Sequence, residues 1–188
     1  MGTYSQSVVA RGTITPEEAK RLGECIVAWL VDEEIIEHRL TECCLVDSGY
    51  PPGRHYRRAC GGIDDHAREE DHAELLRSSP HGVELHTKRY CFFNSQGDFG
   101  PARCLHCAAE RDFDAYYEAS NEWMKGGIGE LHCGHCGRTS IVTAWEHDDL
   151  LWSTLGLVFW GWPELSPAFL DELSRRIDCR VSIIFGKL

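Results

Sequence analysis

The stretch LLWSTLGLVFWGWP, residues 150–163, is the longest uncharged apolar run in this chain of 188 residues. A helix needs about 20 apolar residues to cross a bilayer, so the run is too short for a membrane span. Residues 152–160 within it predict a strand that is apolar almost throughout, and Pro163 ends that strand. We therefore expect this strand in a packed core.

The elements on either side of this strand alternate between strand and helix. Residues 141–145 predict a strand before it. After it, Ser166-Pro167 predicts a helix start, and residues 181–185 alternate in polarity as a final strand does. The helix between them carries an apolar stripe of three residues: Phe169, Leu173 and Ile177.

The N-terminal part predicts a short strand over residues 7–14 and then a long helix. Thr15-Pro16-Glu17-Glu18 is a capping box with proline at the first helical position. Apolar side chains then recur at helical spacing on one face: Leu22, Ile26, Trp29 and Leu30. This pattern is typical of a helix packed against a sheet.

Residues 64–78 predict a polar helix, and residues 83–93 predict a strand. The helix contains His66 and His72 among several carboxylates. The two histidines are six residues apart and so point to different sides of a helix, which favours a solvated charged helix over a metal or acid–base site.

This order of elements predicts an α+β fold, with a mostly antiparallel sheet and helices packed on one face. A ferredoxin-like β-α-β, β-α-β core is one candidate topology. Residues 94–140 carry four of the cysteines and predict an inserted zinc-ribbon region with four cysteine ligands. We therefore expect a core formed by residues 1–93 and 141–188, with the insertion between its two parts.

Two C-x-x-C pairs mark the insertion, Cys104/Cys107 and Cys133/Cys136. Four thiolates from two such pairs complete the tetrahedron of one zinc ion, and a site with four protein ligands has no open position for catalysis. We expect one structural Zn²⁺ that supplies folding energy to a region otherwise short of core. Unliganded cysteines or a redox-active pair are the alternatives.

The second pair has glycine at positions 134 and 137, which permits the tight turns of a zinc knuckle. The first pair fits this pattern less well, because Ala108 and Ala109 follow Cys107. Three histidines lie nearby: His106, His132 and His135. The two between cysteines are expected to turn away from the ion, whereas His132 remains an alternative fourth ligand.

Residues 104–137 resemble zinc-ribbon modules. The loop 49–53, the paired knuckles, the Trp-rich strand and the C-terminal strand ending at 186–188 together look like small uncharacterised bacterial proteins. A small acidic protein with exposed aromatics is also similar in type to immunity proteins that neutralise secreted toxins. These resemblances imply no catalytic residues.

Trp160 and Trp162 flank Gly161 and are candidate partner-binding residues, because tryptophan is enriched at interface hot spots. The alternative is that they complete the core at the end of the strand. Residues 54–58 form the one local basic cluster with an aromatic residue, and we expect it to pair with the acidic first helix rather than with an anionic partner.

The chain contains 30 acidic and 19 basic residues, a formal net charge of -11. This balance disfavours phosphate binding and suits a basic protein partner. No secretory leader is recognisable, so we expect a cytoplasmic protein. The remaining cysteines are then free thiols of unassigned role: Cys25, Cys43, Cys44, Cys60, Cys91 and Cys179.

Together these features predict a non-catalytic, zinc-stabilised protein-binding module, with an immunity or adaptor role as the specific hypothesis. No recognised nucleophile, phosphate-binding or metalloprotease motif occurs in the chain. Two alternatives stay open: a nucleic-acid-associated zinc-ribbon protein, and an enzyme whose site has no recognisable motif.

Overall fold

The computed structural model of the chain describes residues 3–45, 48–61, 73–74, 77, 80–94, 96–97 and 99–187. Its helices there are α1 (Pro16–Asp32), α3 (Phe113–Met124) and α4 (Pro167–Ile177), with 3₁₀ turns η1 (Tyr56–Ala59) and η2 (Val142–Ala144). Its strands are β1 (Tyr4–Ala10), β2 (Gly82–His86), β3 (Tyr90–Phe93), β4 (Ala102–Arg103), β5 (Glu110–Arg111), β6 (Glu130–His132), β7 (Thr139–Ile141), β8 (Leu150–Ser153), β9 (Gly156–Trp160) and β10 (Val181–Lys187). The polar helix predicted over 64–78 falls largely outside the described residues.

The largest sheet in the described part of the chain has four antiparallel strands in the order β10-β1-β9-β2. One helix follows β1 and another joins β9 to β10, so numbering only the sheet strands along the chain gives the order 4-1-3-2. This is the order of a ferredoxin-like sheet. The structure therefore confirms the α+β class and agrees with the candidate topology.

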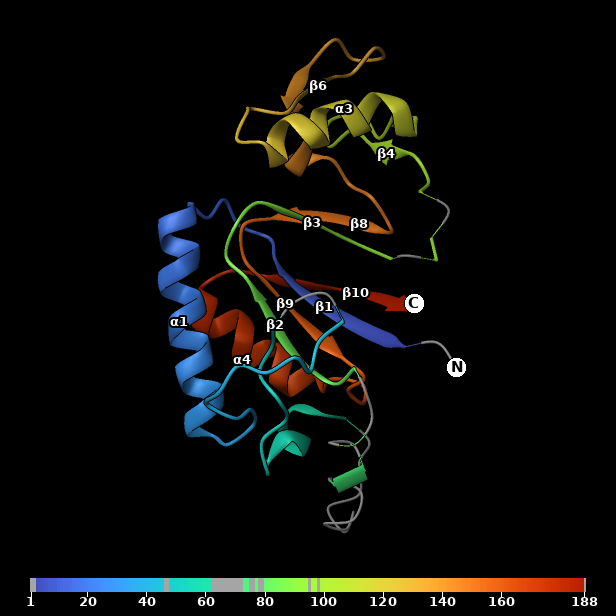
Figure 1. Cartoon of the computed structure of the whole chain (residues 1–188). Coiled ribbons are helices and arrows are strands. Elements are labelled where there is room, and N and C mark those ends of the chain that lie inside the picture. The colour runs from blue at the N-terminus through green and yellow to red at the C-terminus, as the bar shows by residue number, and fades with distance from the viewer. Residues whose placement is uncertain are drawn as a thin grey trace.

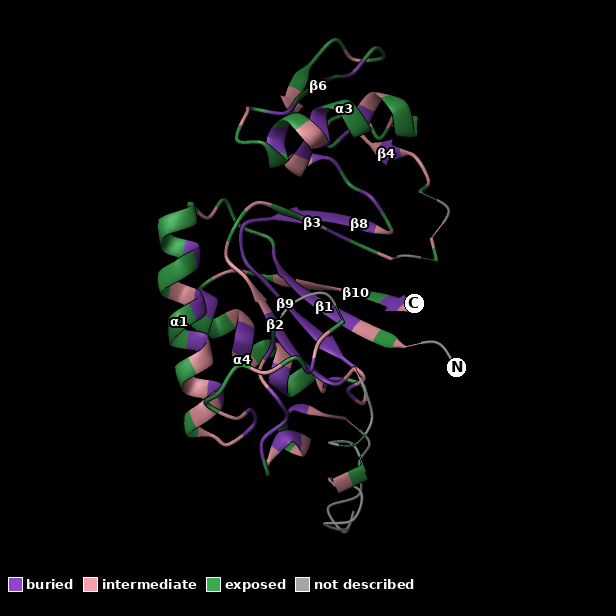
Figure 2. Cartoon of the chain, in the orientation of Figure 1, coloured by how far each residue is buried: buried purple, intermediate pink, exposed green. Residues whose placement is uncertain are grey.

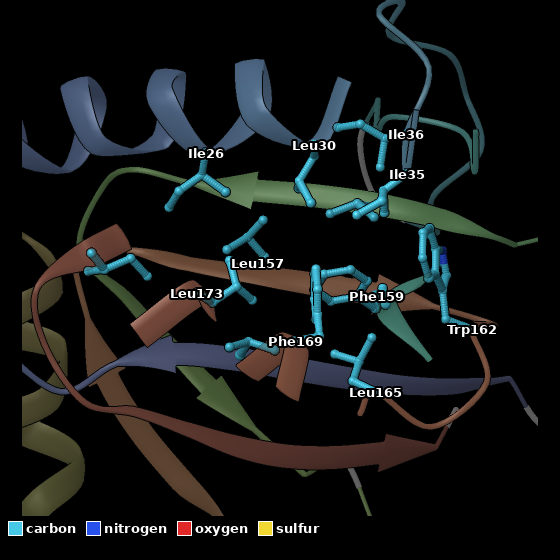
Figure 3. Close-up of a cluster of buried hydrophobic side chains, with 14 of the residues drawn as sticks. Ile26, Leu30, Ile35, Ile36, Leu157, Phe159, Trp162, Leu165, Phe169 and Leu173 are labelled. Carbon is cyan, nitrogen blue, oxygen red and sulfur yellow. The ribbon is translucent and has the colours of Figure 1, made fainter. Parts of the chain in front are cut away.

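Helices α1 and α4 cover one face of this sheet (Figure 1). The apolar stripes of both helices meet the central strand β9 in the main core (Figure 3). The side chains at this interface are Ile26 and Leu30 of α1, Phe169 and Leu173 of α4, and Leu157 and Phe159 of β9. All residues of β9 are buried, as expected for an interior strand covered on both faces.

The start of α1 is the predicted capping box. The backbone N–H of Glu18 donates to Thr15 Oγ1 at 3.2 Å, and the backbone N–H of Thr15 donates to Glu18 Oε2 at 3.0 Å. The exposed faces of α1 and α4 turn outward, as Figure 2 shows. The basic cluster at 54–58 pairs with the two acidic residues just after α1: Arg54 with Glu34 at 2.6 Å, and Arg58 with Glu33 at 3.1 Å.

Two strands of the prediction are each divided in the structure. Residues 83–93 form β2 and β3, and residues 152–160 lie in β8 and β9. The chain bends after His86 in the first segment and after Ser153 in the second, so that β2 pairs with β9 and β3 pairs with β8. At the second bend, Ser153 Oγ donates to the carbonyl of Ala10 at 2.8 Å. Polar residues stand at both bends, Thr87 to Arg89 at the first and Ser153 and Thr154 at the second, and each division of a strand falls there.

The pair β3–β8 lies over the sheet face opposite the helices (Figure 1). Phe92 of β3 packs into a small core there with Val158 and Trp160 of β9. Gly156 makes this approach possible, because a Cβ at that position would lie 2.4 Å from the Phe92 ring. The β3–β8 pair therefore links the four-stranded sheet to the region that carries the cysteine pairs.

The cysteine-bearing region has a core of its own, contrary to the expectation that it lacks one. Helix α3, which the sequence reading missed, supplies the largest share of it. The buried members are Ala102, Cys104, Tyr116, Ala119, Trp123, Leu131, Cys133, Val142, Trp145, Leu150 and Trp152. The strand predicted over 141–145 is also wrong, because Val142–Ala144 turn in η2 and place Trp145 in this core.

Candidate metal centre

The two C-x-x-C pairs form two hairpins with matching backbone hydrogen bonds. In the first, the N–H of Ala108 donates to the carbonyl of Cys104 at 2.8 Å, and in the second, the N–H of Gly137 donates to that of Cys133 at 2.9 Å. Strands β4 and β5 flank the first hairpin, and β6 and β7 flank the second. Each hairpin is thus held by a short antiparallel strand pair, and the two hairpins bring their thiol pairs together.

The sulfur atoms of Cys104, Cys107, Cys133 and Cys136 all lie within 4.8 Å of one another. The Sγ atoms of Cys104 and Cys136 are 3.9 Å apart, and those of Cys107 and Cys133 are 3.6 Å apart. A tetrahedral zinc with Zn–S bonds of about 2.3 Å requires sulfur–sulfur distances of about 3.8 Å. The thiol cluster thus has the dimensions of a tetrahedral tetrathiolate site.

The first knuckle has the same backbone shape as the second, despite its alanines. Ala108 has φ +57° and Gly137 has φ +71°, so each knuckle ends on a residue in the left-handed region. Glycine adopts that conformation without cost, whereas alanine is strained there. Alanine in place of glycine therefore raises the conformational energy of the first knuckle, but both knuckles have the same backbone geometry.

Hydrogen-bond donors surround the thiols. The backbone N–H groups of Cys136 and His135 lower the pKa of Cys133 to about 6, which favours its thiolate form. In the first knuckle, the N–H of His106 points at Cys104 Sγ at 3.5 Å. Such donors offset the negative charge that collects when several thiolates share one ion.

The nearby histidines are not part of the thiol cluster in the described structure. Arg138 Nη1 donates to His106 Nδ1 at 3.0 Å and so links the two knuckles. His132 Nδ1 lies 3.3 Å from Thr139 Oγ1 on the exposed side of β6. The group of side chains that could hold a metal ion there consists of the four cysteines, and His132 does not replace any of them.

His147 packs against Tyr116, a member of the core that also contains Cys104 and Cys133, with ring centroids 5.3 Å apart. His147 Nε2 donates to the carbonyl of Gly100 at 2.7 Å, and its Nδ1 accepts the N–H of Asp149 at 2.9 Å. Burial lowers the pKa of His147, which keeps the imidazole neutral in this arrangement. Each ring nitrogen therefore has a fixed structural partner.

Trp160 and Trp162 lie outside the core that contains the four-cysteine cluster, and on different sides of the sheet. Trp160 is 7 % exposed and its indole N–H donates to Glu84 Oε2 at 3.0 Å, whereas Trp162 is 6 % exposed and packs in the main core. Their burial favours the alternative that they complete the core. A role in partner binding stays a prediction.

The sequence reading missed a row of exposed aromatic side chains on α3 and the segment before it. Phe99, Phe113 and Tyr117 are 41 %, 38 % and 51 % exposed, and they line a groove next to β3. The spacing of Phe113, Tyr117 and Met124 is a helical signal that could have revealed this face. From the sequence, residues 94–140 were assigned to a zinc-ribbon insertion, and no helix was predicted between the two cysteine pairs.

Comparison of the chain with family models, with curated proteins and with solved structures found no match. The likeness to zinc ribbons therefore rests on the two knuckles themselves, and no relative supports the likeness to immunity proteins. No helix in the described ranges is both long enough and apolar enough to cross a membrane.

Proposed function

We propose that the four cysteines bind one structural Zn²⁺, because all four sulfur atoms lie within 4.8 Å of one another and two of their separations, 3.9 and 3.6 Å, are close to the edge of a zinc tetrathiolate. Four protein ligands would close the coordination sphere, so the ion would hold the two hairpins together rather than activate water. With the ion in place, the region from 94 to 140 would be an insertion stabilised by metal and by its own core. The structural core beneath it extends to Leu150 and Trp152.

Metal analysis of the purified protein tests this assignment. We expect about one zinc ion per chain that survives dialysis. Cys133→Ser should lose the metal, because it removes a buried ligand. Cys25→Ser is the matched control, since Cys25 is exposed and lies outside the cluster. A metal-free protein whose four clustered thiols react freely with iodoacetamide would contradict the assignment.

We also propose that the whole protein is a non-catalytic, cytoplasmic protein-binding module for a basic partner, with an immunity or adaptor role. The observation that carries this proposal is an acidic chain that exposes aromatic side chains in a groove between α3 and β3. Acidic surfaces steer basic partners, and aromatic side chains are common binding anchors.

Affinity capture from the native host tests the binding function. Zinc-loaded wild-type protein is the bait, and the metal-free Cys133→Ser protein is the matched control. We expect a stoichiometric basic protein whose capture weakens with added salt, since exposed charge pairs are screened. An acidic partner, or capture of nucleic acid instead of protein at low salt, would contradict the proposal.

A further inference from the structure

A groove of about 280 Å³ runs between β3 and α3. Its walls are aromatic and thioether side chains, chiefly Tyr90, Phe93, Phe99, Phe113, Tyr117 and Met124. None of its lining residues carries a charge. It is smaller than the cavities of about 300–1,000 Å³ that enclose drug-sized ligands, so it suits a few side chains of a larger partner.

The rings of this groove form a continuous row. The ring centroids of Phe93 and Phe99 are 6.2 Å apart, those of Phe99 and Phe113 are 5.5 Å apart, and Phe113 stacks on Tyr117 at 5.2 Å. Aromatic rings at these separations support one another in defined orientations. The exposed rings of this row therefore pack against one another rather than standing singly on the surface.

The solvent side of α3 next to this row is acidic. On a helix of 100° per residue, Asp114 and Glu118 lie on one flank of the stripe formed by Phe113, Tyr117 and Met124, whereas Glu122 points away from it. Asp114 and Glu118 are both exposed, and neither has an ion-pair partner among the residues that the structure describes. The apolar groove thus has two carboxylates without ion-pair partners on the helix that forms one of its walls.

From this arrangement we infer that the groove is the docking site for a basic segment of a partner protein. The segment places large apolar side chains over Phe113 and Tyr117, and its Lys or Arg side chains reach the carboxylates of α3. Cations can also bind the exposed ring faces. The inference rests on the proposed protein-binding function and moves the binding surface from Trp160 and Trp162 to α3.

Selection from a random-peptide phage library against the zinc-loaded protein tests this inference. We expect enriched peptides that combine Lys or Arg with large apolar residues. Tyr117→Ser should weaken them by about tenfold or more, as loss of an aromatic anchor does. The Asp114→Asn/Glu118→Gln double variant should weaken them less and reduce their salt dependence.

Phe185→Ser is the matched control, because Phe185 is 56 % exposed on the edge strand β10 and lies outside the groove. The affinity of the Phe185→Ser variant for the selected peptides should stay within about twofold of wild type. All variants are checked for zinc content and for unchanged circular dichroism, so that loss of binding reports the groove.

Four outcomes would overturn the inference. Peptides that bind Tyr117→Ser as tightly as wild type would show that the groove is not the binding site, without contradicting the proposed protein-binding function. Enriched peptides that need Tyr117 but contain no Lys or Arg would contradict the inference that the partner segment is basic. A selection that enriches no peptide would contradict the docking of a peptide segment in this groove. A concentration-dependent dimer that Tyr117→Ser abolishes in sedimentation would make a second copy of the chain the occupant.

Discussion

Ala108 and Gly137 end the two knuckles in the same left-handed conformation, although only one of them is glycine. No side chain surrounds a Cβ at position 137 within 4 Å, so the difference between the two positions is one of backbone energy alone. The pair of knuckles is therefore an internal comparison of glycine and alanine in one structural setting.

Ala108→Gly should stabilise the protein by about 0.5–1 kcal/mol, because glycine removes the left-handed strain of alanine. Gly137→Ala should destabilise it by about 1–2 kcal/mol for the same reason. Urea unfolding of the zinc-loaded variants measures both changes. Equal stability of all three proteins would show that the knuckles are not held in this conformation.

The buried neutral His147 makes stability depend on pH. Burial lowers its pKa below the unfolded value of about 6.5, so the unfolded state binds the proton more readily. The stability it contributes is complete above pH of about 6.5 and is lost as the pH falls, by less than about 1.4 kcal/mol per pH unit. His147→Gln should flatten this slope between pH 7 and about 5.5 in thermal unfolding curves. An unchanged slope would refute the assignment.

At the scale of elements, α3 is held at both ends. Asp112 accepts the N–H of Ala115 at 3.3 Å at its start. At its other end, Arg89 Nη1 donates to the carbonyls of Trp123 and Gly127 at 2.8 and 2.6 Å, and the guanidinium lies 5.2 Å from the Trp123 ring. Arg89 follows β2, so this contact ties the helix to the central sheet.

Arg89→Met should destabilise the protein by about 1–3 kcal/mol, because it leaves two partly buried carbonyls without their donor. Arg89→Lys should retain part of that stability through one hydrogen bond. Arg39→Met is the control and should change stability by less than about 0.5 kcal/mol, since Arg39 is exposed. Chemical denaturation measures all three, and similar losses for Arg89→Met and Arg39→Met would contradict this role.

At the scale of the molecule, the chain has a core between the sheet and its two helices and another around α3 and the thiol cluster. The first contains none of the four clustered cysteines. The β3–β8 pair joins the two, so metal loss should act locally before it acts globally.

Removal of metal with a chelator should raise amide hydrogen exchange in β6, β7 and α3 and leave β1, β9 and β10 protected. The reason is that the main core keeps all its packing when the thiolates lose their ion. Mass spectrometry of exchanged peptides distinguishes the regions. Simultaneous loss of protection in both would mean that the two cores unfold as one unit.

Local signals were sufficient for much of the fold. The capping box at Thr15, the stripe of α4 and the final strand each depend on neighbouring residues, and so they could be predicted. The four cysteines were also predictable as a group, because a metal site imposes short spacings on the chain. Helix α3 was missed because its apolar residues, Phe113 and Tyr117 among them, lie in an otherwise polar segment between the two pairs.

The amino-acid pattern alone was enough to predict the α+β class, the helix start at Thr15 and the four-cysteine set. The folded structure was needed to show where the apolar runs bend, how the two knuckles meet, and that Trp160 and Trp162 are buried while Phe113 and Tyr117 are exposed. The physical reason is that capping and ligand spacing act between close neighbours in the chain. Burial depends on which distant segment packs against a residue, as the Phe92 ring packs against Gly156.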